Sequence, residues 1–102
     1  MTLYLHKRQG IVYEAAVFNG GEKNAEELVA WLKRNQATAR WVAGPLEHIL
    51  FGSVPCVAMA LVGYYIIKGL DGVFIPLRPD SFHNTFEEYQ NDFEHPVLSQ
   101  KA

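Results

Sequence analysis

The sequence predicts an α+β fold in which one main helix, at about residues 24–36, packs on an antiparallel sheet of four to five strands. Two observations lead to this fold class. One segment has the apolar spacing of an amphipathic helix, and it lies among several short runs of β-branched and aromatic residues. In addition, Asp71-Gly72 separates two apolar runs, which is typical of a tight turn and places a C-terminal β-hairpin at residues 64–77.

The first strand is expected at residues 11–18, and Asn19-Gly20-Gly21 ends it. Asn24 is a suitable N-cap for the helix that follows, and Glu27, three residues later, completes a capping-box pair. From there to about Gln36, apolar residues recur at helical spacing and form the expected buried stripe, which consists of Ala25, Leu28, Val29, Trp31 and Leu32.

The centre of the chain raises the question of a membrane span. Residues 49–67 contain no charged side chain and are long enough to cross a bilayer as a helix. Gly52-Ser53, Pro55 and Gly63 interrupt this stretch, and the hairpin needs residues 64–68 as a strand. We therefore expect two strands of a sheet, at 38–43 and 54–62, and no membrane span.

The strand at 54–62 has two apolar faces of different size. Val57, Met59 and Leu61 share one face, which we expect to pack under the helix. The small residues of the opposite face form the predicted interface, which consists of Cys56, Ala58, Ala60 and Val62. Because an apolar surface usually marks a contact, we expect a homodimer or a partner protein there, with coverage by the C-terminal tail as the alternative.

The predicted hairpin has a two-residue turn at Asp71-Gly72, which pairs Leu70 with Val73 and Lys68 with Ile75. After it, Asp80 or Ser81 is expected to cap a short helical turn near residues 80–86. In that turn Phe82 and Phe86 stand at positions i and i+4 and are expected to stack.

Composition indicates one globular domain at 1–88 and an acidic C-terminal tail at 89–102, in which Tyr89 or Phe93 is the expected anchor. The chain has 102 residues, of which 49% are hydrophobic, and a net charge of −2, which argues against a nucleic acid or an anionic membrane as partner. Cys56 is the only cysteine, and the N-terminus has no apolar signal segment. These observations favour the cytoplasm.

The chain contains no recognisable catalytic motif, so we expect neither enzymatic activity nor a cofactor. The four histidines lack metal-ligand spacing. Arg78, Asp80 and His83 form a candidate ligand corner, which would suit a phosphate or a nucleotide. The alternative is that these residues only fix the exit of the hairpin.

Three blocks of the chain resemble a widespread family of small proteins encoded by tailed bacteriophages and prophages. They are LHKRQGIVYEAAVF at 5–18, AEELVAWL at 25–32 and GYYIIKGLDGVFIPLRPDSFHNTF at 63–86. The last block is the most specific, although Tyr64 replaces the usual Asp and Phe86 the usual Tyr, and Gln9-Gly10 stands where Lys-Pro is usual in the first block. The resemblance implies a phage origin, the host cytoplasm and an α+β fold, but no activity.

This resemblance, with the small size of the chain, predicts a non-catalytic phage accessory protein that binds a host or phage protein, as a takeover or anti-defence factor. Two alternatives stay open. One is a structural protein of the virion or its assembly, and the other is a small nucleotide-binding protein that uses the corner at 78–83.

Overall fold

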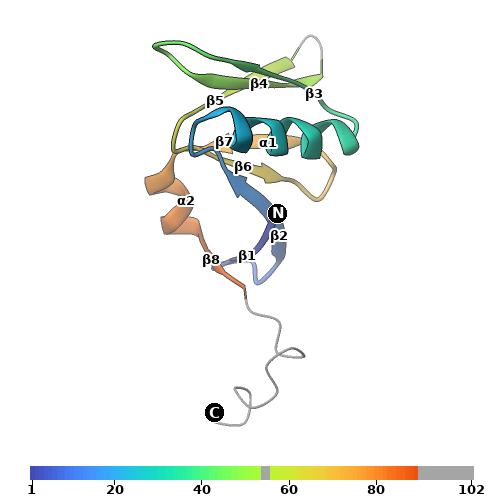
Figure 1. The fold of residues 1–102 in the computed structure, drawn as a ribbon. Helices are drawn as coiled ribbons and strands as arrows, with labels where there is room; N and C mark the ends of the chain where they lie inside the picture. The colour runs from blue at the N-terminus through green and yellow to red at the C-terminus, as the bar shows by residue number, and fades with distance from the viewer. Residues whose placement is uncertain (54–55, 90–102) are drawn as a thin grey trace.

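The computed structural model describes residues 1–53 and 56–89 as two antiparallel sheets with a helix between them (Figure 1). The five-stranded sheet has the order β7-β6-β2-β1-β8, with β1 (Thr2–His6), β2 (Val12–Val17), β6 (Tyr65–Lys68), β7 (Phe74–Leu77) and β8 (Phe86–Glu88). The three-stranded sheet has the order β3-β4-β5, with β3 (Thr38–Val42), β4 (His48–Ser53) and β5 (Cys56–Leu61). The helices are α1 (Glu22–Arg34) and α2 (Pro79–Thr85). The predicted α+β class is confirmed.

The five-stranded sheet is built from two separate parts of the chain. β2 and β6 are neighbours in it, although α1 and the whole three-stranded sheet lie between them in the sequence. Two backbone hydrogen bonds close this insertion, because Phe18 N–H donates to Tyr64 O at 2.9 Å and Gly63 N–H donates to Phe18 O at 2.7 Å.

Two hydrophobic cores lie on opposite faces of the five-stranded sheet. The larger core joins α1, the three-stranded sheet and one face, and it includes Leu28, Phe51 and Ile66. The smaller core is aromatic and lies under α2 on the other face, where Phe82 joins Ile67. Since neighbouring residues of a strand point to opposite faces, Ile66 and Ile67 enter different cores.

The main helix has its predicted buried stripe but begins earlier than predicted. Gly21 is the N-cap, with φ 92°, and Asn24 lies inside the first turn. Its Oδ1 accepts a hydrogen bond from Asn19 N–H at 2.7 Å and thereby holds the preceding loop. The predicted cap at Asn24 is therefore wrong, because Gly20 and Gly21 let the chain turn before it.

The hairpin of β6 and β7 lies where it was predicted, but its register is shifted by one residue. Lys68 lies opposite Phe74 rather than Ile75. Because successive side chains of a strand point to opposite faces, this shift turns Phe74 toward α1 and Ile75 toward the side of α2.

The shift arises in the turn, which holds three residues, 70–72. Gly69 N–H donates to Val73 O at 2.8 Å, and Gly72 N–H donates to Gly69 O at 3.0 Å. A two-residue turn of the Asp-Gly type needs a positive φ at both central residues. Gly72 has φ 87°, whereas Asp71 has no positive φ and accepts a hydrogen bond from Val73 N–H instead.

The orientation of β5 is the reverse of the prediction. Ala60 is fully buried and Ala58 packs against the larger core, whereas Val57 and Met59 are 53% and 42% exposed. Ala58 lies opposite Phe51 in the register, so the large side chain of β4 fills the core beside it. Small residues thus suit the inner face of β5, where Ala60 packs into the larger core.

The C-terminal part of the domain combines α2 with β8. Arg78 is the N-cap of α2, and Pro79 occupies the first helical position, so neither Asp80 nor Ser81 caps it. The stacking of Phe82 on Phe86 is confirmed, with ring centroids 5.0 Å apart.

β8 was not predicted, because the acidic residues Glu87 and Glu88 have no strand-like pattern. It pairs with β1, where Glu88 lies opposite Tyr4, and Tyr89 N–H donates to Leu3 O at 3.1 Å. The tail from residue 90 on, with Phe93, lies outside the described residues. Within the residues that the structure describes, no helix is long and apolar enough to cross a membrane.

Candidate functional site

A groove opens between the two hairpins of the molecule, next to the end of α1. The β4–β5 hairpin supplies one wall, which includes Phe51, Val57 and Ala58. The β6–β7 hairpin supplies the other wall, which includes residues 71–76. The volume of this space is about 610 Å³. We call it the hairpin groove.

The end of α1 closes the groove and is tied firmly to the neighbouring strand. Asn35 Nδ2 donates to Trp31 O at 2.8 Å, and Lys68 Nζ donates to Asn35 Oδ1 at 2.8 Å. Trp31 also packs edge-on against Phe74 of the groove wall, with ring centroids 5.0 Å apart. Trp31 Nε1 is buried without a hydrogen-bond partner among the described residues. These contacts make the inner end of the groove a preformed surface.

The rim of the hairpin groove exposes large apolar side chains. Val57 is 53% exposed on one wall, and Val73 and Ile75 are 59% and 52% exposed on the other. Leu70, in the adjacent turn, is 70% exposed. Isolated apolar side chains on a surface need no explanation, but a group of them around one groove is typical of a binding site.

β7 brings free backbone groups to the same place. It pairs with β6 on one side and is an edge strand of the five-stranded sheet described here. Gly69 and Val73 form a hydrogen-bonded pair, and bonded and non-bonded pairs alternate in an antiparallel ladder. Counted from this pair, Phe74 and Pro76 stand in non-bonded pairs with β6. The N–H and C=O of Phe74 and the C=O of Pro76 therefore point away from β6. Pro76 has no N–H, which is the usual position of a proline in an edge strand.

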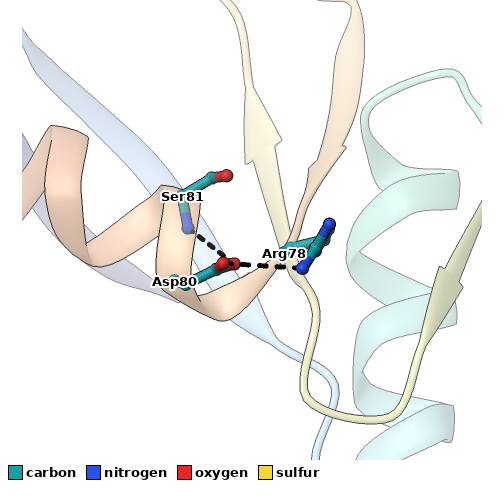
Figure 2. Close-up of polar contacts among 3 residues, drawn as sticks. All are labelled: Arg78, Asp80 and Ser81. Carbon is teal, nitrogen blue, oxygen red and sulfur yellow. Dashed lines mark hydrogen bonds and ion pairs between the residues drawn. The ribbon is translucent and has the colours of Figure 1, made fainter.

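The predicted ligand corner is only partly assembled. Arg78 Nη2 lies 3.5 Å from Asp80 Oδ2, and both side chains are 67% exposed. Figure 2 shows this pair, together with the hydrogen bond that Ser81 N–H donates to Asp80 Oδ1 at 2.9 Å. The His83 ring packs edge-on against the Tyr65 ring instead, with centroids 5.5 Å apart.

The residues of the predicted interface are dispersed. Ala58 lines the hairpin groove, Ala60 lies in the larger core, and Val62 is 49% exposed beyond the end of β5. The side chain of Cys56 lies outside the described part. Val73 and Ile75 were not predicted as exposed groove residues, because an apolar residue on an edge strand has the same sequence pattern as a core residue.

No group of three or more His, Cys, Asp and Glu side chains in residues 1–53 and 56–89 is arranged to hold a metal ion. No protein-family model, curated protein or solved structure matches the chain. The geometry of the hairpin groove therefore carries the functional argument.

Proposed function

We propose that the protein is a small non-catalytic accessory protein that binds another protein, and that the hairpin groove takes an extended apolar segment of that partner. The observation that carries this proposal is the coincidence of three features at one place. An apolar groove, an exposed apolar rim and a strand edge with outward backbone groups all meet at β7.

Strand addition at a sheet edge combines two kinds of contact. Main-chain hydrogen bonds supply affinity, and pockets for alternate side chains supply specificity. The edge of β7 offers one N–H, from Phe74, and two C=O groups, from Phe74 and Pro76. This is enough for a segment of a few residues, whose apolar side chains enter the groove. Its volume of about 610 Å³ suits one or two large side chains.

The biological setting of the proposal rests on the resemblance to proteins of tailed phages and prophages. In that setting the partner is a host or phage protein in the host cytoplasm, and binding serves takeover of the cell or evasion of its defences. A virion or assembly protein is the alternative in the same setting.

The nucleotide alternative has less support at the corner of residues 78–83. A phosphate group would need the Arg78 guanidinium, which is already paired with the carboxylate of Asp80. That carboxylate also repels an anion at the same place.

The proposal is tested by comparing what immobilised variants retain from a host lysate. Ile75→Glu places a charge at the groove rim, and Val57→Glu does so on the opposite wall. Leu46→Glu is the matched control, because Leu46 is 62% exposed and precedes the end of β4 remote from the groove. We expect a specific protein on the wild type and on the control, and a loss of at least tenfold on both groove variants.

Two outcomes contradict the proposal. The first is a wild-type protein that retains nothing specific, and the second is full retention by Ile75→Glu. Melting curves of all variants show whether a loss reflects binding or unfolding.

A further inference from the structure

The outer face of the three-stranded sheet is apolar, and no described element covers it. The sheet is the outermost layer of the molecule, with α1 on its inner side (Figure 1). The register sets three rows of side chains on the outer face. They are Thr38, Gly52 and Val57; Arg40, Leu50 and Met59; and Val42, His48 and Leu61.

The chemistry of this outer face differs from that of a sheet that meets water. An antiparallel sheet with one solvated face normally alternates apolar and polar residues. Here Arg40 is the only formal charge in the three rows, His48 is the only other titratable group, and there is no carboxylate. Met59, in the middle row, is 42% exposed.

We propose that a second copy of the chain docks on this outer face, sheet against sheet, about a two-fold axis parallel to β4. The axis brings Leu50 close to its own copy, and it lays β3 of one subunit over β5 of the other. Arg40 then lies against Met59 of the partner subunit. Its apolar stem packs on the thioether while its guanidinium reaches water at the rim.

Charge favours a second copy over a charged partner. The two-fold axis places the two Arg40 side chains at opposite edges of the interface, so like charges stay apart. Apart from His48, the remaining residues of the rows have uncharged side chains, and they need no complementary charge on a partner. The face is thus complementary to itself, which is the requirement of a two-fold interface.

The size of the face predicts a weak and reversible dimer. Three strands of the observed length cover about 14 by 20 Å, from the usual strand spacing and rise. Two flat faces of this size amount to about 560 Å². The relief of the side chains raises the buried area toward about 1,000 Å², which is the low end of specific interfaces.

The C-terminal tail is the other segment that needs to be considered for this face. The described chain ends at Tyr89, whose N–H binds Leu3 O on β1. β1 belongs to the five-stranded sheet, on the far side of α1 from the outer face (Figure 1). A tail that starts there has to pass the whole molecule to reach this face, whereas a second copy meets it directly.

Sedimentation velocity over a concentration series tests the proposal on the full chain. For the wild type we expect the apparent mass to rise with concentration from the 11.5 kDa of one chain toward twice that value. Met59→Glu places a charge in the middle row and is expected to stay monomeric at every concentration. Leu70→Glu adds a charge at an exposed apolar residue in the turn of the β6–β7 hairpin, away from the rows, and is expected to behave as the wild type.

Disulfide trapping gives a second measurement that does not depend on a destabilising charge. In a Cys56→Ser background, Leu50→Cys is expected to form a covalent dimer under mild oxidation, because the axis brings the two thiols together. Leu70→Cys, in the turn of the β6–β7 hairpin, is expected to stay monomeric in the same background.

Three outcomes overturn the inference. The first is a wild type that is monomeric at every concentration, and the second is a dimer that persists in Met59→Glu. The third is a chain that dimerises only when residues 90–102 are deleted, which would show that the tail covers the outer face. If the wild type is monomeric and Met59→Glu loses a protein that the wild type retains from the lysate, the outer face binds that different protein instead. Val57 belongs to both the outer face and the hairpin groove, whereas Leu50 and Met59 do not line the groove, so variants at these two positions separate the dimer from groove binding.

Discussion

The carboxylate of Glu47 joins the start of α1 to the three-stranded sheet. Its Oε2 accepts hydrogen bonds from Gly21 N–H at 2.8 Å and from Trp41 Nε1–H at 2.9 Å. Gly21 is the N-cap of α1, where a negative charge also interacts favourably with the helix dipole.

We expect Glu47→Ala to lower the free energy of unfolding by about 1–2 kcal/mol, because it leaves the partly buried Trp41 Nε1–H and the exposed Gly21 N–H without this acceptor. Glu47→Gln keeps an oxygen at the same place and is expected to lose less. Urea unfolding of the three proteins measures the difference. Equal stability of Glu47→Ala and the wild type would show that water replaces the carboxylate at no cost.

Tyr4 makes the stability of the protein sensitive to alkaline pH. Burial raises the pKa of its phenol above the ordinary value of 10.0, and the nearby charges of Tyr65 and Glu88 raise this pKa further. The folded state thus favours the neutral phenol. The contribution of Tyr4 to stability is fully present below the pKa that its phenol has in the unfolded chain. It is lost as the pH rises through the higher pKa of the phenol in the folded chain.

We therefore expect the free energy of unfolding to fall as the pH rises above about 10, the ordinary pKa of tyrosine, and Tyr4→Phe to make that fall shallower. Urea unfolding at several pH values measures both slopes. Identical slopes in the two proteins would mean that Tyr4 titrates alike in the folded and unfolded chains.

At the level of elements, the turn of the β6–β7 hairpin depends on the backbone of Gly72. Its φ is 87°, and a Cβ added there would meet nothing within 4 Å. Gly72→Val is therefore expected to cost about 1–3 kcal/mol through backbone strain alone. Gly72→Asn is the control, since Asn tolerates this region and is expected to cost less. Thermal melts of both variants test this, and a Val variant as stable as the Asn variant would contradict it.

How far the sequence predicts these elements depends on what each pattern specifies. The helical stripe around Leu28 and the turn at Asp71-Gly72 are local signals, and both elements are found. Alternation along β5 shows which residues share a face, but it does not show which face is buried. That choice depends on Phe51 of β4, which fills the core beside Ala58.

The short strands and the candidate groove depend on contacts between distant residues. β8 has only three residues, and its partner β1 lies at the other end of the chain, so no local pattern indicates it. The hairpin groove likewise forms only because two hairpins, around Val57 and Val73, are brought together by the fold. The sequence predicted both hairpin segments as apolar, but not their proximity.

At the scale of the whole molecule, the five-stranded sheet couples two cores that carry different chromophores. Trp31 and Trp41 lie in or against the larger core, whereas Tyr4, Tyr13 and Tyr65 pack against the smaller one. Tryptophan fluorescence therefore reports on the larger core, whereas tyrosine absorbance reports mainly on the smaller one, since only Tyr64 packs against the larger core among the tyrosines that pack against either.

We expect Phe82→Ala to shift both signals together in one unfolding transition. Phe82 is 1% exposed and stacks on Tyr65 with centroids 3.8 Å apart, so its loss is expected to cost about 3–5 kcal/mol. Leu46→Ala, an exposed control, is expected to leave both midpoints unchanged. A tyrosine midpoint that falls while the tryptophan midpoint stays would show that the cores unfold separately.

The insertion between Phe18 and Tyr64 also governs how the chain folds in time. Hairpins such as β6–β7 form between near neighbours, but β2 meets β6 only after the ends of this long segment come together. Closing such a loop has an entropic cost before any contact offsets it, and folding rates fall as contacts become more distant in sequence. We therefore expect the docking of β6 on β2 to be slower than the formation of the three-stranded sheet, whose strands are close neighbours in the sequence.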